Sequence, residues 1–225
     1  MQSENISSDQ DKRSFIETAR RAQIVECAIE AIAELGFNQA SLAQIAKRAK
    51  VSTGVILYYF ASKEDLIREV VAHVFATGER FIRPRVDADQ ASARNALCAF
   101  IEASVVFIAA NPKNVLAVMN IMRAGRNESG ALRFDPTVEE PRRTGFREIL
   151  EWGQRTGEFR PFLVRVMVVT IIEAVDSIPS QLAAEPDLDL VAYGQALVEL
   201  FDRATRSDEK SPNGASDSAT RMGRP

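Results

Sequence analysis

Residues 41–60 constrain the fold of this chain more than any other stretch, because they predict two short helices joined by a tight turn. Ser41 is suited to cap the start of the first helix. The inward positions of that helix follow helical spacing and are Leu42, Ile45, Ala46 and Ala49. Ser52 is suited to cap the second helix, whose buried side carries Ile56 and Phe60.

The outward side of the second helix is small, hydroxyl-bearing and aromatic. It carries Thr53, Gly54, Val55, Tyr58 and Tyr59. A short helix with this surface suits the major groove of double-stranded DNA, because bulky side chains near its start would block entry. The small inward residues of the first helix allow the two helices to pack closely at a steep angle. The pair therefore predicts a helix-turn-helix that reads DNA.

Further helices flank this pair on both sides. Upstream, residues 20–35 have an amphipathic helical pattern, and Gly36 is suited to end that helix in a left-handed conformation. Downstream, Ser62 followed by acidic residues predicts a new helix start. An apolar helical pattern then runs over residues 62–82 and is expected to end at Pro84.

In this ordered set of features the chain resembles the tetracycline-repressor (TetR) family of bacterial transcription regulators. The matching residues are Gly36, Phe37, Ser41, Ile45, Ala46, Ala49, Val51, Ser52, Gly54, Tyr58, Phe60, Ser62, Lys63, Glu64 and Leu66. They lie within residues 20–67. The ordered set as a whole is specific for the family, whereas no single residue would be. The chain departs from the family pattern at Leu57 and Tyr59, which stand where a Tyr and a His are common, and at Lys50, where a Gly is usual. We therefore expect the turn to form without a left-handed position at Lys50.

Ten residues are the candidate DNA contacts. Ser41, Lys47, Tyr59 and Lys63 are expected to hold phosphates; Thr53, Gly54, Val55 and Tyr58 are expected to face base edges; Gln44 and Ser52 complete the set. Residues 12–63 contain eight Lys or Arg and four acids, a local charge of +4 in a chain whose net charge is −3. A basic region inside an acidic protein favours DNA binding by that region.

The remaining sequence predicts an all-α fold of about nine helices, because strand signals are nearly absent. The later helices are expected over residues 89–110, 112–126, 136–156, 161–183 and 187–205, the last capped by Asp187. The expected domains are a disordered arm (1–13), a helix-turn-helix DNA-binding domain (14–66), a helical ligand-binding and dimerisation domain (67–206) and a disordered tail (207–225).

The predicted helix over residues 161–183 is apolar on several sides and therefore needs partners on several sides. The resemblance implies that the last two helices form a four-helix interface in a homodimer. The candidate interface residues are Val169, Ile172, Leu197 and Phe201. A helix buried in the core of a monomer is the alternative.

The resemblance also implies a small-molecule pocket among the C-terminal helices. The candidate ligand-binding residues are Glu102, Phe107, Met119, Met122, Trp152, Glu173 and Asp176. The three acids lie inside apolar stretches, where an isolated carboxylate is unfavourable. They either meet a cationic ligand or form ion pairs with Arg123, Arg126 or Arg165, and the aromatic and Met side chains either line the pocket or belong to ordinary core.

Catalytic groups are hard to assemble from this sequence. It has one histidine, His73, and it lacks a phosphate-binding Gly-rich loop and paired Cys or His at metal-binding spacing. We expect no enzyme activity, no cofactor and no metal. No apolar run approaches the ~20 residues of a membrane span, and the N-terminus lacks a signal pattern. A cytoplasmic protein without a membrane partner is expected.

These features predict a ligand-responsive dimeric transcription regulator, a repressor. It would bind a palindromic DNA operator through helices 41–49 and 52–60 and be released by an unidentified small-molecule effector. Two alternatives stay open. One is a constitutive DNA-binding dimer, favoured if the C-terminal core lacks a cavity of ~300 Å³ or more. The other is a helical enzyme or scaffold in which the helix-turn-helix is incidental.

Overall fold

The structure, a computed structural model, describes residues 3–88, 91–125, 130 and 136–207. These residues form an all-helical fold, as predicted, with ten α-helices and one 3-10 helix where about nine helices were expected. The elements are α1 (Ser3–Leu35), α2 (Leu42–Ala49), α3 (Thr53–Tyr59), α4 (Lys63–Asp87), α5 (Ala93–Ala110), α6 (Pro112–Arg123), the 3-10 helix η1 (Pro136–Glu139), α7 (Glu140–Thr156), α8 (Val164–Asp176), α9 (Ile178–Ala184) and α10 (Leu190–Thr205).

Serine side chains fix the starts of four helices. Ser41, Ser52, Ser62 and Ser92 each accept, through the side-chain oxygen, a hydrogen bond from the backbone N–H three residues later, at 3.1–3.3 Å. Each of these bonds satisfies one of the N–H groups that a helix start leaves without a partner. The sequence predicted the first three caps, and α2, α3 and α4 begin directly after them.

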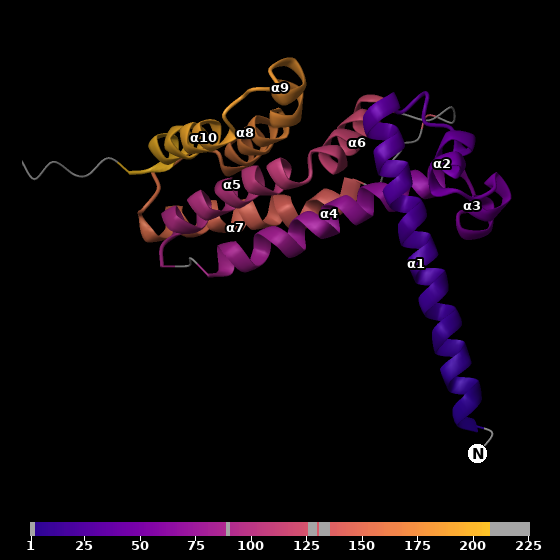
Figure 1. Ribbon diagram of the computed structural model, residues 1–225. Helices are drawn as coiled ribbons and strands as arrows, with labels where there is room; N and C mark the ends of the chain where they lie inside the picture. The colour runs from indigo at the N-terminus through magenta and orange to yellow at the C-terminus, as the bar shows by residue number, and fades with distance from the viewer. Residues whose placement is uncertain (1–2, 89–90, 126–129, 131–135, 208–225) are drawn as a thin grey trace, which may run out of the picture.

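The first helix is much longer than predicted. α1 begins at Ser3, so the structure has a helix over residues 3–13, where the sequence predicted a disordered arm. The chain has no Pro or Gly before Gly36, and nothing in its backbone chemistry interrupts a helix there. Figure 1 shows the N-terminal part of α1 extending away from the other helices. Residues 1–2 and the predicted tail from residue 208 onward lie outside the described residues.

Other helix boundaries also differ from prediction: α5 begins at Ala93, α6 ends at Arg123, α7 begins at Glu140 and α8 begins at Val164. Three further differences have a direct cause in the sequence. α4 passes through Pro84 and ends at Asp87, because only the final turn follows the proline and the lost hydrogen bond affects a single carbonyl. The helix predicted over residues 161–183 is divided into α8 and α9, because Pro179 lacks the N–H that would continue it. Asp189 and not Asp187 caps α10, since its carboxylate accepts from the backbone N–H groups of Val191 and Ala192 at 3.0 and 3.1 Å.

The buried apolar side chains form two clusters that share α4. The first, here called the reading core, consists of side chains of α1, α2, α3 and α6, together with α4 from Leu66 to Val74. The second, the cavity core, consists mainly of α5, α7, α8 and α10, together with Ile82 and Val86 of α4. In Figure 1, α4 runs from the side of α1, α2 and α3 along the length of α5 and α7. The predicted domain division between residues 66 and 67 falls inside α4 and stays a prediction.

α5 is the most apolar helix of the cavity core. By length and composition it could cross a membrane, with a mean hydropathy of 1.5 over 18 residues, yet 56% of it is buried inside the protein. It packs against α4, α7 and α10. A helix that is apolar on most sides and enclosed by other helices occupies the position of a core helix.

Candidate nucleic-acid interface and internal cavity

The turn between α2 and α3 is made by a strained residue. Lys50 caps the end of α2 with φ 54° and ψ 44°, and it is the one non-glycine residue with positive φ in the described parts of the chain. The backbone N–H of Val51 donates to the Ala46 carbonyl at 3.0 Å and closes the turn. The expectation of a turn without a left-handed position is therefore wrong. The turn keeps that geometry, and Lys50 adopts it at a cost of about 1–2 kcal/mol.

All but one of the predicted inward residues of the helix-turn-helix are buried; Leu42 is half-buried and packs against the reading core. Ile45, Ala46, Ala49, Ile56 and Phe60 are each at most 4% exposed. Ile56 is the one buried residue of α3. The rest of that short helix therefore faces outward or lies at the edge of the reading core.

Most of the candidate DNA contacts lie on this outward surface. Ser41, Gln44, Lys47, Ser52, Gly54 and Tyr58 are exposed, and Thr53 and Val55 are half-buried. Tyr58 is 74% exposed. A Cβ atom added at Gly54 would meet only the Ser52 hydroxyl, at an ordinary contact distance of 3.7 Å. Packing within the chain therefore does not require a glycine at this position.

Two candidate contacts are engaged inside the chain. Lys63 Nζ donates a hydrogen bond to the Phe37 carbonyl at 3.2 Å and lies 4.7 Å from the centre of the Phe37 ring. Tyr59 is half-buried and packs edge-on against Tyr58, with ring centroids 5.0 Å apart. Lys63 thus holds the start of α4 against the loop after α1. Because these contacts engage its ammonium group, Lys63 has less capacity left to bind phosphate.

Arg21 joins three helices around the end of α3, a role that was not predicted. Its Nη1 donates to the Tyr59 carbonyl at 2.7 Å, and its Nη2 pairs with Glu69 of α4 at 2.8 Å. Its guanidinium group also lies 4.3 Å from the centre of the Phe60 ring. Carbonyls in the last turn of a helix lack helical partners, so Arg21 satisfies one of them and holds α3 against α1 and α4.

A second polar network attaches α2 and α6 to α1. Arg48 of α2 contacts Glu30 at 3.2 Å and Glu34 at 2.6 Å, and Lys113 of α6 contacts Glu34 at 3.1 Å. The hydrogen bonds from Arg48 and then Lys113 lower the pKa of Glu34. These contacts join residues far apart in sequence, so neither spacing nor composition could predict them.

A cavity of about 270 Å³, partly open to solvent, lies where the reading core and the cavity core meet. Its wall is built by α4 from Val74 to Asp87, by α5, α6 and α7, and by the end of α8. The lining is mostly apolar, and its aromatic side chains are Phe75, Phe100, Phe107 and Trp152. The volume is slightly below the ~300 Å³ at which ligand pockets begin, so size alone does not separate a ligand site from a packing defect.

Five of the seven candidate ligand residues line this cavity: Phe107, Met119, Met122, Trp152 and Asp176. Glu102 and Glu173 do not line it, contrary to expectation, and both are exposed. An acid inside an apolar helix can lie on the solvent side of that helix, where it needs no buried partner. Neither Glu102 nor Glu173 forms an ion pair with a described residue.

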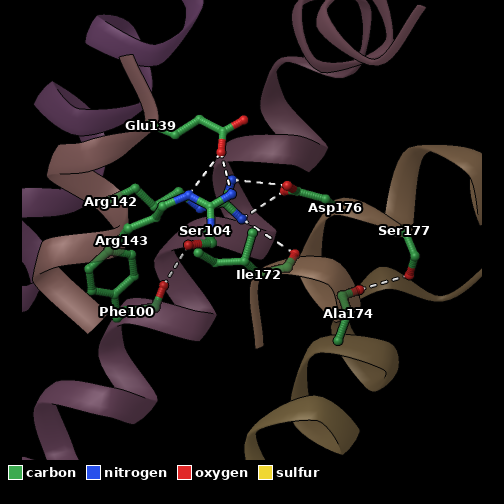
Figure 2. Close-up of polar contacts among 9 residues, drawn as sticks. All are labelled: Phe100, Ser104, Glu139, Arg142, Arg143, Ile172, Ala174, Asp176 and Ser177. Carbon is green, nitrogen blue, oxygen red and sulfur yellow. Dashed lines mark hydrogen bonds and ion pairs between the residues drawn. The ribbon is translucent and has the colours of Figure 1, made fainter. Parts of the chain in front are cut away.

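The polar part of the wall is shown in Figure 2. Arg142 of α7 holds Asp176 with two hydrogen bonds of 2.7 and 3.2 Å, and the neighbouring Arg143 pairs with Glu139. Ser104 is 3% exposed, and its hydroxyl donates to the Phe100 carbonyl at 2.8 Å. The ion-pair alternative therefore holds for Asp176.

The partner of Asp176 is not one of the three arginines considered from the sequence. Arg123 donates to Ser180 at 2.7 Å, Arg165 is exposed, and Arg126 lies outside the described residues.

The structure places three of the four candidate interface residues inside the chain's own core. Ile172, Leu197 and Phe201 are at most 8% exposed and belong to the cavity core, so they are not available to a partner subunit. They lie on the sides of α8 and α10 that face the rest of the cavity core, and the sequence could not tell these sides from the outer ones. Val169 is 40% exposed. Other exposed apolar residues on or beside these helices are Leu163, Val166, Val191 and Leu200.

Residues 24–70 match the family model described as bacterial regulatory proteins, tetR family. The matched segment runs from the buried half of α1 through α2 and α3 into α4. This chain carries the DNA-binding domain of the TetR family. The resemblance seen in the sequence over residues 20–67 is thereby confirmed.

The curated relatives match the TetR part of the chain. The chain is 35% identical over 88 residues to the HTH-type transcriptional regulator BetI of Escherichia coli (strain UMN026 / ExPEC), which is 39% of this chain and 45% of that relative. It is 41% identical over 59 residues to BetI of Escherichia coli (strain SE11), which is 26% of this chain and 30% of the relative. The chain therefore aligns with less than half the length of these relatives.

Solved structures of the TetR type share the fold beyond the matched domain. A tetR-family regulatory protein from Rhodococcus RHA1 is similar with a TM-score of 0.73 at 20% identity, over 84% of this chain and 98% of that chain. FadR from Bacillus subtilis in complex with stearoyl-CoA is similar with a TM-score of 0.67 at 25% identity, over 80% and 96%. AibR in complex with isovaleryl coenzyme A and operator DNA has a TM-score of 0.70 at 18% identity, over 80% and 97%.

In the described parts of the chain, no group of three or more His, Cys, Asp or Glu is arranged to hold a metal ion. The one histidine, His73 on α4, contacts Glu26 of α1 at 3.1 Å and is half-buried. It therefore has a partner on α1, at the exposed side of the contact between α1 and α4.

Proposed function

We propose that this TetR-family protein is a ligand-responsive, dimeric transcription repressor that acts in the cytoplasm. It binds a palindromic operator through α2 and α3 and leaves the operator when a small molecule occupies the cavity. The observation that carries the proposal is the position of α4, which supplies Leu66–Val74 to the reading core and lines the cavity from Val74 to Asp87. A ligand that prefers one arrangement of the cavity wall would therefore bias the position of the DNA-reading helices.

On DNA, α3 would lie in the major groove with Thr53, Gly54, Val55 and Tyr58 toward the base edges. Ser41, Gln44 and Lys47 of the α2 region, with Ser52 and Tyr59, would flank the phosphates. Lys63 would contribute less, because the Phe37 carbonyl and ring already engage its ammonium group. The buried side of both helices keeps this surface rigid, which favours a defined docking geometry.

Dimerisation would use exposed apolar side chains and not the buried ones first considered. On α8, Val166 and Val169 are three residues apart and share an outward face, and Leu163 precedes them at the same spacing. Figure 1 shows α8 and α10 on the same side of α5. A self-complementary face there would give a two-fold dimer, and two-fold dimers read two half-sites about one helical turn of DNA apart.

The two alternatives have less support. The cavity of about 270 Å³ is slightly below the ~300 Å³ threshold, so its size does not count against a constitutive dimer. Its position does, because α4 supplies side chains both to the cavity wall and to the reading core. AibR, which has the same fold, was solved with both a coenzyme A thioester and operator DNA. A helical enzyme or scaffold would leave the match of residues 24–70 to a DNA-binding family unexplained.

The proposal is tested first by DNA binding. The purified protein would be used to select a duplex from a random-sequence library, and the affinity of that duplex measured by fluorescence anisotropy at several salt concentrations. Lys47→Ala should lower the slope of log affinity against log salt by about one unit, because one phosphate contact is lost. Arg155→Ala is the matched control, since it removes an exposed positive charge from the last turn of α7 and should leave the slope unchanged.

Gly54→Ala tests whether α3 itself enters the groove. The added methyl group meets only the Ser52 hydroxyl, and Ala favours a helix over Gly by about 1 kcal/mol, so the folded protein should be at least as stable as the wild type. The same methyl group would stand between α3 and the bases, so affinity for the selected duplex should fall at least tenfold. Failure to select any duplex would overturn the proposal, and unchanged affinity of the Gly54→Ala protein would show that α3 is not the reading helix.

A further inference from the structure

The cavity combines an apolar interior with an excess of negative charge in its wall. Six charged side chains line it: Glu79, Asp87, Glu148 and Asp176 against Arg83 and Arg142. Four carboxylates against two guanidinium groups leave a net charge of −2. An aromatic and acidic lining of this kind differs from what a ligand with several phosphates would need.

Neither guanidinium group offers uncompensated positive charge to a ligand. Arg142 is held by both oxygens of Asp176 at 2.7 and 3.2 Å. Arg83 donates through Nε and Nη2 to one oxygen of Glu79 at 3.1 and 3.0 Å. An anionic ligand would have to displace these carboxylates, and the displaced carboxylates would remain in or beside the cavity.

The buried polar atom of the wall is an acceptor. Ser104 is 3% exposed, and its hydroxyl proton is already donated to the Phe100 carbonyl at 2.8 Å (Figure 2). Its oxygen can therefore only accept a further hydrogen bond. The interior of the cavity thus favours a ligand that carries a donor or a positive charge.

Glu148 and Trp152 lie one helical turn apart on α7, and both line the cavity. Glu148 is exposed and forms no ion pair with a described residue, whereas Trp152 is half-buried and packs against the cavity core. The indole ring is the strongest aromatic acceptor of a cation, and a nearby carboxylate adds a Coulomb attraction. Together they form a place for a cationic head group at the edge of the apolar interior.

We propose that the cavity binds a small apolar organic cation, with its apolar body inside the cavity and its ammonium group at Glu148 and Trp152. A cavity of about 270 Å³ limits the size of the body, since a dry cavity of about 150 Å³ holds one benzene molecule. A branched or ring-containing cation with roughly twice the volume of benzene would fill the cavity. This inference rests on the proposed function only for the step from binding to DNA release, because binding can be measured on the protein alone.

The experiment uses Trp152, the single tryptophan of the chain, as its own reporter. Its fluorescence would be titrated with octyltrimethylammonium, 1-octanol, octanoate and octanoyl-CoA, each below its micellar concentration. The cation should produce a saturable change and bind at least tenfold more tightly than 1-octanol, because both share the same apolar chain. Octanoate and octanoyl-CoA should bind more weakly than 1-octanol.

The Glu148→Gln protein separates charge recognition from apolar binding. It should bind octyltrimethylammonium about fivefold more weakly than the wild type and bind 1-octanol unchanged. Glu151→Gln is the control, since Glu151 is exposed on the same helix and does not line the cavity; it should leave both affinities unchanged. Equal loss in the two variants would mean that general surface charge attracts the cation, and it would overturn the site.

Two further outcomes separate this inference from the proposed function. If octanoyl-CoA binds most tightly and releases the selected duplex, the regulator stands and the cationic ligand class is wrong. If octyltrimethylammonium binds with the predicted preference but leaves DNA bound, the ligand class stands and the coupling through α4 is wrong.

Discussion

The reading core and the cavity core are built from the same kinds of side chains but are packed to different degrees. In the reading core, α1, α2, α3, α6 and the first half of α4 enclose Ile24, Ile32, Ile45, Ile56 and Phe60, which are all fully buried. Most of the cavity wall belongs to the cavity core, where the packing leaves about 270 Å³ open, and the reading core borders this space only at its edge, with Val74 and Val118. A closed core holds a DNA-reading surface rigid, whereas an incompletely filled core can change when something fills it.

The two regions also differ in what they leave on the surface. Around α2 and α3 the surface is basic, small and hydroxyl-bearing, with Tyr58 as the most exposed aromatic group. On α8 and α10 the surface carries isolated aliphatic residues such as Val169. The first surface suits a polyanion and the second suits another apolar face, so under the proposed function DNA and the partner subunit would bind at different parts of the molecule.

The largest expected effect comes from a charge placed inside the cavity core. The same change on the exposed face of α8 serves as its control. Leu197→Asp would bury a carboxylate without a partner in the cavity core, at a cost of several kcal/mol, and should unfold the protein. Val169→Asp lies on the exposed face of α8 and should give a folded monomer with weak operator affinity. Circular dichroism and sedimentation distinguish the two results. Val106→Asp, an equally apolar and exposed position on α5, should remain dimeric.

A dimeric Val169→Asp protein would contradict the proposed interface. A fully folded Leu197→Asp protein would contradict the assignment of Leu197 to the core. If Val106→Asp alone became monomeric, the interface would lie on the outer side of α5.

The second prediction compares equal truncations in the two cores. Ile32→Ala in the closed reading core should lower the free energy of unfolding by about 3–5 kcal/mol, because the surrounding side chains cannot collapse into the space. Ile149→Ala in the cavity wall should cost about 2 kcal/mol, since one side of Ile149 already lacks contacting atoms. Urea denaturation of both proteins measures the difference. If both variants lost the same free energy of unfolding, side chains would have to move in solution and fill the cavity.

The same contrast explains which features the sequence could predict. In the reading region the signals are local. Ser41, Ser52 and Ser62 each cap the helix that begins at the next residue, by accepting from the backbone N–H three residues ahead, and Ile56 and Phe60 fall on one face by spacing alone. Local hydrogen bonds and helical periodicity decide these features within a few residues. The boundaries and the buried face of α2 and α3 were therefore predicted.

In the cavity region the deciding contacts are long-range. The sequence shows that Ile172 and Glu173 are neighbours on an apolar helix, but not that the first faces the chain's own core and the second faces solvent. The helices packed against an apolar helix decide which of its sides is buried in the core and which stays available to a partner. Arg142 was missed as the partner of Asp176 for the same reason, since the two side chains are 34 residues apart in the chain.

The third prediction tests how α3 is held between α1 and α4. Arg21→Ala removes the bond to the Tyr59 carbonyl and the pair with Glu69, so α3 should lose its fixed position. We expect about 1–2 kcal/mol less stability and roughly tenfold weaker binding to the selected duplex. Arg20→Ala is matched for charge and position, because half-buried Arg20 donates, among the bonds described, only to Gln23 on the same helix, at 2.7 Å.

Arg20→Ala should therefore change DNA affinity much less than Arg21→Ala does. The fluorescence of Trp152 should be the same in both proteins, since neither residue lines the cavity. Equal effects of the two changes on DNA affinity would mean that Arg21 acts through its charge and not by positioning α3.

The smallest expected effect concerns the strain in the turn of the reading region, at Lys50. With φ at 54°, Lys50 adopts a conformation that costs a side-chain-bearing residue about 1–2 kcal/mol, whereas Gly adopts it freely but loses about 0.5–1 kcal/mol through the entropy of the unfolded chain. Lys50→Gly should therefore raise the free energy of unfolding by about 0.5–1 kcal/mol, as measured in urea. Lys50→Asn should raise it by less, because Asn tolerates the left-handed region without the flexibility of Gly.

A loss of stability in both variants would mean that the Lys50 side chain stabilises the fold by more than its backbone strain. A gain in stability together with weaker, less salt-dependent DNA binding would show that the chain retains a strained lysine here because its charge faces the phosphates.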